Sequence, residues 1–125
     1  MRRAVVRNRL KAYLSQRKRC FYCGLPMWLA QKDKARFATR HRLSPEAAAE
    51  LQCTAEHMGA RRDNGTHDPW NIVAACLHCN RARHAVADPK DPLAYGQQIH
   101  TAMLDGAWHS DEVRNAFKTA VSGDA

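Results

Sequence analysis

The sequence predicts an α+β fold: a strand–loop–strand–helix unit with helices on both sides. Two short apolar runs, 53–57 and 71–75, have the length and composition of buried strands. The residues after 76 begin a helical pattern, and the segments before 20 and after 88 place apolar residues at helical intervals. A chain of 125 residues has room for one core of this kind, so we expect one domain.

The domain is expected to have three parts. Residues 1–19 form a basic N-terminal helix, residues 20–87 form the central unit, and residues 88–125 form a C-terminal helical extension that packs on the same domain. In the first part, the helix is predicted over residues 2–19. Its apolar stripe consists of Val6, Leu10, Tyr13 and Leu14.

The next segments are short. Residues 25–30 are expected to be extended, and residues 31–42 are expected to form a loop because they are polar and show no clear period. Ser44 is suited to cap a short helix that ends near residue 52, since Pro45 fits the first turn and alanines follow.

The central strands are joined by a loop over residues 59–70, in which Asn64-Gly65 is a turn signal. The second strand leads into a helix over residues 77–87, which Pro89 ends. Two further helices are predicted, with caps at Asp91 and Ser110. Their apolar faces are Tyr95, Ile99, Met103 and Ala107 in one helix, and Val113, Ala116, Phe117, Ala120 and Val121 in the other. The three tryptophans, Trp28, Trp70 and Trp108, are expected to be packing residues and not platforms for base stacking, although Trp70 lies next to the loop after His57.

The charge is strongly basic and unevenly distributed. The net charge is +8, and residues 1–42 contain thirteen Lys and Arg against the single acid Asp33. Residues 88–125 contain three basic and six acidic residues. This asymmetry favours a polyanionic partner such as nucleic acid, although a solvated cationic helix would show the same composition.

The sequence predicts no membrane association. No apolar run approaches the roughly 20 residues that a spanning helix needs, and the arginine-rich start lacks the apolar core of a secretory leader. We therefore expect an intracellular, cytoplasmic protein, encoded by a bacterium or a phage.

Four of the five cysteines form two C-x-x-C pairs. Each pair places two thiolates on one tight turn, so two pairs can complete a tetrahedral four-sulfur site for structural zinc. A redox role is the alternative, but it would explain only one pair. We predict Zn²⁺ on Cys20, Cys23, Cys76 and Cys79. Cys53 is expected to be a buried strand residue and His78 a residue at the helix start.

Glu56, His57 and Asn80 suit phosphodiester hydrolysis. This reaction needs a base for water and a cation that stabilises charge on the phosphate, and a histidine titrating near neutral pH can be the base. Carboxylate and amide oxygens are ligands that Mg²⁺ accepts. Asn80, Arg83 and His84 share one helical face.

Over about residues 20–87, the chain closely resembles the HNH endonuclease family. The resemblance rests on an ordered series of motifs: Cys20-Phe-Tyr-Cys23, Glu56-His57, Asn64-Gly65, Asn71 and Cys76-Leu-His-Cys79-Asn80, with Arg83 after them. It implies the ββα-metal (His-Me) finger fold with a structural zinc site made of four cysteines. Asn80 stands where many members have histidine, which makes the chain an HNN variant, and Glu56 stands where aspartate is usual.

The resemblance also implies roles for these residues. His57 would be the general base, and Asn71 would brace the loop that aims it. Glu56 and Asn80 would hold a catalytic Mg²⁺ or Mn²⁺, with His84 as an additional ligand. Arg83 could contact phosphate, and we also expect contacts to the DNA backbone from Arg61 and Arg62, which lie in the loop after His57.

The function predicted is hydrolysis of DNA phosphodiester bonds, with one strand nicked per active site by a monomer or a dimer. Two alternatives stay open at the sequence level. One is a non-catalytic, zinc-stabilised DNA-binding module. The other is an accessory subunit of a phage packaging or restriction complex, in which the acidic C-terminal helices would serve as the docking surface.

Overall fold

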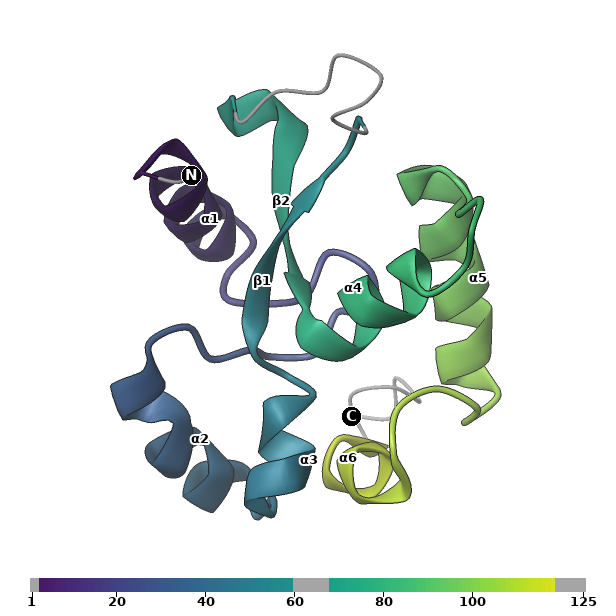
Figure 1. Cartoon of the computed structure of the whole chain (residues 1–125). Helices are drawn as coiled ribbons and strands as arrows, with labels where there is room; N and C mark the ends of the chain where they lie inside the picture. Colours follow the sequence, from purple (N-terminus) through teal and green to yellow (C-terminus); the bar gives the residue numbers. More distant parts are fainter. Residues whose placement is uncertain (1–2, 60–67, 119–125) are drawn as a thin grey trace.

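A two-stranded antiparallel hairpin forms the centre of the computed structural model, which describes residues 3–59 and 68–118 (Figure 1). Strand β1 (Cys53–His57) pairs with β2 (Ile72–Cys76), so that Cys53 lies opposite Cys76 and His57 opposite Ile72. Helix α4 (Leu77–His84) follows β2 without a break. The order β1–β2–α4 confirms the predicted α+β class and its ββα unit.

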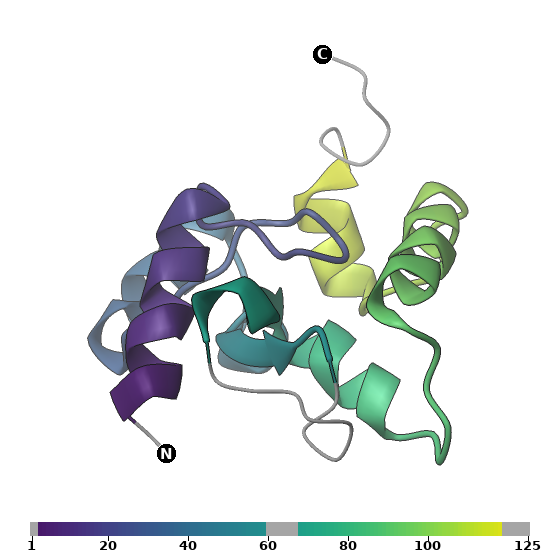
Figure 2. The same cartoon turned by 90° about the horizontal axis from the view of Figure 1, so that it is seen from above.

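Two helices lie on opposite sides of the hairpin. Figure 2 shows α1 (Arg3–Ser15) along one side and α4 along the other. Gln16, which follows α1, hydrogen-bonds the backbone of β2 through its side-chain amide. The amide donates to the Ala74 carbonyl at 2.8 Å and accepts from the Ala74 N–H at 2.9 Å. His57 lies at the loop end of this hairpin, opposite the end at which Cys53 pairs with Cys76.

Helix α1 uses a different face from the one that its apolar residues predict. Val5, Asn8 and Ala12 are buried, whereas the side chains of Val6, Leu10 and Leu14 are about half exposed. The prediction of the buried stripe was therefore wrong. The narrow approach to the hairpin favours a small residue, Ala12, and the polar Asn8 over the bulkier leucines.

The segment 31–42 is helical, which contradicts the loop predicted there. It contains the 3-10 turn η1 (Gln31–Asp33) and helix α2 (Lys34–His41), which ends at Arg42 in the left-handed conformation. None of its residues is fully buried, so no strong apolar period marks the helix. Lysine, alanine and arginine nevertheless have high helix propensity, and this local preference decides the structure.

The remaining elements follow the predictions with shorter bounds. Helix α3 (Pro45–Ala49) is capped by Ser44, whose hydroxyl accepts from the Ala47 N–H at 3.1 Å. Residue Asn71 belongs to the 3-10 turn η3 (Pro69–Asn71) and not to β2. The predicted turn Asn64-Gly65 lies outside the described residues.

The C-terminal extension packs as two helices, α5 (Pro92–Leu104) and α6 (Asp111–Ala116), with the predicted caps at Asp91 and Ser110. The predicted residues Tyr95, Ile99 and Met103 of α5 are buried. Ala107 and Ala116 are exposed because each lies at or beyond the end of its helix, and Ala120 and Val121 fall outside the described residues. No helix among the described residues is long and apolar enough to cross a membrane.

Candidate functional site

The four knuckle cysteines converge on one point. The sulfurs of Cys20, Cys23, Cys76 and Cys79 all lie within 4.8 Å of one another, and the Sγ atoms of Cys23 and Cys76 are 3.9 Å apart. A tetrahedral ion with Zn–S bonds of about 2.3 Å places its sulfurs about 3.8 Å apart. The cluster therefore fits zinc, and all five cysteines of the chain are free of disulfides.

Local structure sets this geometry. Gly24 ends the first knuckle with a φ of 75°, a left-handed conformation that glycine adopts without steric cost. Cys76 is both the last residue of β2 and the N-cap of α4, and its sulfur accepts from the Cys79 N–H at 3.4 Å. The Cys76 N–H in turn donates to the sulfur of Cys20 at 3.2 Å, which joins the two knuckles directly.

Two side chains of the C-terminal extension also contact the cluster, and no sequence motif predicted them. Trp108 donates from Nε1 to the sulfur of Cys79 at 3.3 Å, and His109 Nε2 lies 3.3 Å from the sulfur of Cys23. The other ring nitrogen of His109 is 3.1 Å from a carboxylate oxygen of Glu50. Hydrogen bonds from outside the ligand set orient metal ligands and tune them.

The pKa values of these groups follow from the contacts. Burial alone would lower the pKa of His109, but its contacts with Cys23 and Glu50 outweigh burial and raise it. Hydrogen bonds from Cys20, from the other cluster cysteines and from His109 hold the pKa of Cys23 well below its ordinary value. Both shifts favour a protonated imidazole beside a thiolate at this edge of the cluster.

Cys53 stands apart from the cluster, as predicted. Its side chain is buried on β1, and burial raises its pKa to about 12. A thiol with so high a pKa stays protonated and is a poor metal ligand or nucleophile.

Glu56 is a buried carboxylate with three partners. It is 2% exposed, and its Oε2 accepts from the hydroxyl of Tyr22 at 3.0 Å and from the guanidinium of Arg83 at 3.1 Å. Its other oxygen, Oε1, lies 3.0 Å from Nε2 of His84. Burial and the nearby carboxylate raise the pKa of Tyr22, so the phenol remains a donor. Tyr22 was not among the predicted site residues, although its place within the first knuckle could have suggested it.

His57 and Asn71 both lie at the loop end of the hairpin, one ending β1 and the other just before β2. His57 is the last residue of β1 and is partly exposed. The buried Asn71 accepts from the Gly59 N–H at 2.7 Å through its side-chain oxygen, and its carbonyl accepts from the Met58 N–H at 2.8 Å. These bonds fix the backbone immediately after His57.

Asn80 lies on the first turns of α4 and faces β1. Its amide nitrogen donates to the Thr54 hydroxyl at 2.9 Å and to the Ala55 carbonyl at 3.3 Å. The amide oxygen takes part in neither bond and is the atom of Asn80 suited to an ion. The role of Asn80 as a metal ligand stays a prediction.

The pair Glu56–His84 has a separation that suits a divalent cation. Adjacent ligands of an octahedral ion with bonds of about 2.1 Å lie about 3.0 Å apart, which is the distance between Oε1 of Glu56 and Nε2 of His84. The His84 side chain is 52% exposed, so the pair is open to solvent on one side.

Arg83 is held inside the protein. It is 8% exposed and donates to Glu56 and twice to the Lys90 carbonyl, at 3.1 and 2.9 Å. This burial does not favour the phosphate contact predicted for it, which stays a prediction. Arg61 and Arg62 lie outside the described residues.

A tryptophan next to Asn71 lies on the surface. Trp70, in η3 beside Asn71, is 72% exposed, so the prediction that it is a packing residue was wrong. Proline and the short 3-10 turn hold it on the surface.

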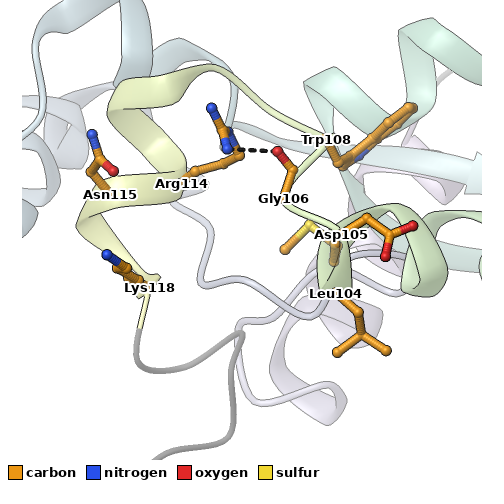
Figure 3. A pocket seen from close by; sticks show the side chains of 8 residues that line it. Leu104, Asp105, Gly106, Trp108, Arg114, Asn115 and Lys118 are labelled. Atoms are coloured by element: carbon orange, nitrogen blue, oxygen red, sulfur yellow. Dashed lines mark hydrogen bonds between the residues drawn. The ribbon is translucent and has the colours of Figure 1, made fainter.

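A hollow of about 360 Å³ lies between the end of α5 and α6 (Figure 3), where Arg114 donates to the Gly106 carbonyl at 2.6 Å. Its lining includes none of the predicted site residues.

Comparison with known families gives one match. Residues 43–85 match the HNH endonuclease family. This segment contains Glu56, His57, Asn71, Asn80 and His84, and it confirms the resemblance that the sequence motifs indicated. Neither the curated proteins nor the solved structures that were searched gave a match to the chain.

Proposed function

We propose that the chain is a metal-dependent endonuclease that hydrolyses DNA phosphodiester bonds at the centre formed by β1 and α4. The observation that carries the proposal is the buried carboxylate of Glu56, which directly precedes His57 and whose Oε1 meets His84. This arrangement lies inside the segment that matches the HNH endonuclease family.

His57 is the general base in this proposal. A neutral imidazole accepts a proton from the attacking water, and this histidine is partly exposed at the end of β1, where substrate can reach it. The bonds of Asn71 to Met58 and Gly59 hold the chain that follows. They support a role for Asn71 in orienting His57.

Glu56, His84 and the amide oxygen of Asn80 would hold the catalytic Mg²⁺ or Mn²⁺. A divalent cation bound there supplies positive charge that stabilises the phosphate and the leaving oxygen. Tyr22 and Arg83 both bond Oε2 of Glu56, which leaves Oε1 turned toward His84. The carboxylate is therefore oriented before an ion binds.

The family resemblance implies products with a 5′-phosphate and a 3′-hydroxyl. One centre holds one general base, so one encounter cleaves one strand and supercoiled plasmid is nicked before it is linearised. The structural zinc on the four cysteines would hold the two knuckles together, and with them the junction of β2 and α4 that positions Asn80 and His84.

The test is nicking of supercoiled plasmid by zinc-loaded protein with and without added Mg²⁺ or Mn²⁺. We expect nicking that needs the added ion and that is lost in Glu56→Gln. His100→Ala, which changes an exposed histidine of α5, is the matched control and should nick at the wild-type rate. DNA binding without cleavage by a folded, zinc-loaded wild type would instead support the non-catalytic module.

A further inference from the structure

A cationic surface lies away from the cleavage centre, between the turn that follows α1 and helix α2. It is a hollow of about 450 Å³, which we call the α1–α2 groove. Its basic lining residues are Arg17, Lys18, Arg19, Arg36 and Arg40. All of them are exposed, and the whole groove lies outside the segment that matches the HNH family.

Few negative charges lie near these cations. Asp33 is the one carboxylate in the lining of the groove. Among the described residues, the ion pairs of arginine and lysine involve only Arg83 and Arg114, so none of the groove cations has one. Like charges that converge without counter-charges create a positive potential, and a polyanion that enters the groove lowers their mutual repulsion.

The backbone of the groove is held in a costly conformation. Arg17 and Lys18 have φ angles of 57° and 64°, in the left-handed region where a residue with a side chain costs about 1–2 kcal/mol. The turn is fixed by bonds from the Arg17 N–H to the Leu14 carbonyl and from the Lys18 N–H to the Tyr13 carbonyl. Glycine is the usual residue at such helix ends, so local stability does not account for two cations here.

The floor of the groove is packed and firm. Trp28 is 3% exposed and donates from its indole to the Ala48 carbonyl at 2.8 Å, and Lys34 lies over its ring. The Tyr13 hydroxyl donates to the Met27 carbonyl at 3.2 Å. The aromatic rings are therefore structural, and the polar rim of arginine and lysine is what a ligand would meet.

We propose that the α1–α2 groove binds the phosphodiester backbone of DNA at a point remote from the bond that is cut. The inference rests on the proposed function for its substrate. The Trp28 carbonyl accepts from the Cys53 N–H at the start of β1, whereas His57 ends the same strand. Figure 1 shows α2 beyond the end of the hairpin at which β1 begins.

The length of β1 sets the scale of this separation. A strand of 5 residues spans about 13 Å between its first and last Cα atoms, at about 3.3 Å per residue. This is about four nucleotide steps of about 3.4 Å along one DNA strand. The groove therefore contacts phosphates several nucleotides from the scissile bond, and it supplies affinity without reading sequence.

The test measures binding separately from cleavage. A fluorescently labelled DNA duplex is titrated with zinc-loaded His57→Ala protein, without added Mg²⁺, at several salt concentrations. The test variant also carries Arg36→Ala and Arg40→Ala, and the matched control carries Arg3→Ala and Arg7→Ala. Each pair consists of two exposed arginines four residues apart on one helix.

Each phosphate contact contributes about 0.9 to the slope of log K against log salt. Removal of Arg36 and Arg40 should therefore reduce the slope by about two and weaken binding by roughly 10- to 100-fold at about 0.1 M salt. The control pair should change both values much less. Equal losses in the two variants, or no loss in either, would overturn the inference.

A second variant guards against loss of structure. Arg17→Gly with Lys18→Gly suits the left-handed turn, so we expect an unchanged or higher Tm together with weaker DNA binding. Weaker binding accompanied by a lower Tm would point to damage to the turn and would count against a direct contact. A wild type that binds through the groove but never cleaves would refute the proposed function and leave this inference standing.

Discussion

At the scale of single residues, the candidate centre depends on one buried carboxylate. Glu56 has one oxygen bound by Tyr22 and Arg83 and the other facing His84. Desolvation of a carboxylate is costly, and here a buried guanidinium and a phenol compensate it. The same two groups fix which oxygen is available to an ion, so the stability of the site and its orientation have one physical origin.

Removal of Arg83 should therefore destabilise the protein strongly. Loss of one partner of a buried ion pair leaves an uncompensated charge and typically costs about 3–5 kcal/mol. We expect Arg83→Ala to lose roughly this free energy of unfolding in urea denaturation of the zinc-loaded protein. Arg81→Ala changes an exposed arginine of the same helix and should have almost no effect. Similar stabilities for the two variants would show that the Glu56 pair is not structural.

At the scale of elements, the C-terminal extension is anchored to the central unit by polar contacts. Glu50, which follows α3, accepts from the Ser110 N–H at 3.1 Å and lies 3.1 Å from His109. Ser44 and Glu112 join α3 and α6 by a hydrogen bond of 2.9 Å between their side chains. The same junction reaches the cysteine cluster through His109 and Trp108. The extension is thus coupled to the metal site and is more than a covering layer.

The pH dependence of stability should report the Glu50 junction. Burial raises the pKa of Glu50, but the hydrogen bonds from Ser110 and the contact with His109 outweigh it and lower the pKa below its ordinary value of 4.5. A depressed carboxyl pKa stabilises the fold at pH values above the ordinary pKa, and this contribution is lost as the pH falls through the folded-state pKa.

We therefore expect Glu50→Gln to be less stable than wild type near neutral pH, with a gap that closes as the pH falls below 4.5. Thermal unfolding of both proteins across this range measures the gap. A gap that stays constant on acidification would contradict the assignment of the junction to an ionised Glu50.

The contact between His109 and Cys23 predicts that the wild type releases zinc more slowly than a variant without the His109 imidazole. Removal of a side chain that hydrogen-bonds a metal ligand typically costs about 10- to 100-fold in metal affinity. We expect His109→Ala to release zinc to a colorimetric chelator faster than wild type by roughly that factor. His100→Ala, on the exposed face of α5, is the control, and equal release rates in both variants would show that His109 has no part in holding the ion.

Much of the fold could be predicted because its elements carry strong local signals. The caps at Ser44, Asp91 and Ser110 were visible in the sequence, and each hydroxyl or carboxylate accepts the expected backbone N–H. The strands and the cysteine pairs were equally clear. Helix α2 was missed because it buries no residue, so only propensity, and no apolar period, marked it.

The sequence did not reveal the contacts around the site that depend on long-range packing. The motifs placed Glu56 and His84 in one site, and the two are in contact, but nothing local showed that Tyr22 would reach Glu56 from 34 residues away. The contact of His109 with Cys23 spans 86 residues. Likewise, α1 turns Ala12 inward and Leu10 outward, because the fit against the hairpin outweighs the hydrophobicity of single residues.

At the scale of the whole molecule, the ββα unit joins three chemically different regions. The cysteine cluster lies where β2 meets α4, the candidate cleavage centre lies along the same helix, and the α1–α2 groove lies between the turn after α1 and helix α2. The net charge of +8 comes mainly from the N-terminal third, while the C-terminal extension is acidic. A polyanionic substrate is therefore expected to approach from the N-terminal side of the molecule.

The central claim is that His57 activates water at a metal-dependent nuclease centre. Chemical rescue tests this claim most directly: His57→Gly is assayed for plasmid nicking in Mg²⁺ or Mn²⁺, with and without added imidazole. We predict that the variant is folded, zinc-loaded and inactive, and that imidazole restores part of the nicking because it replaces the missing base. Wild-type nicking by His57→Gly without imidazole would contradict the account.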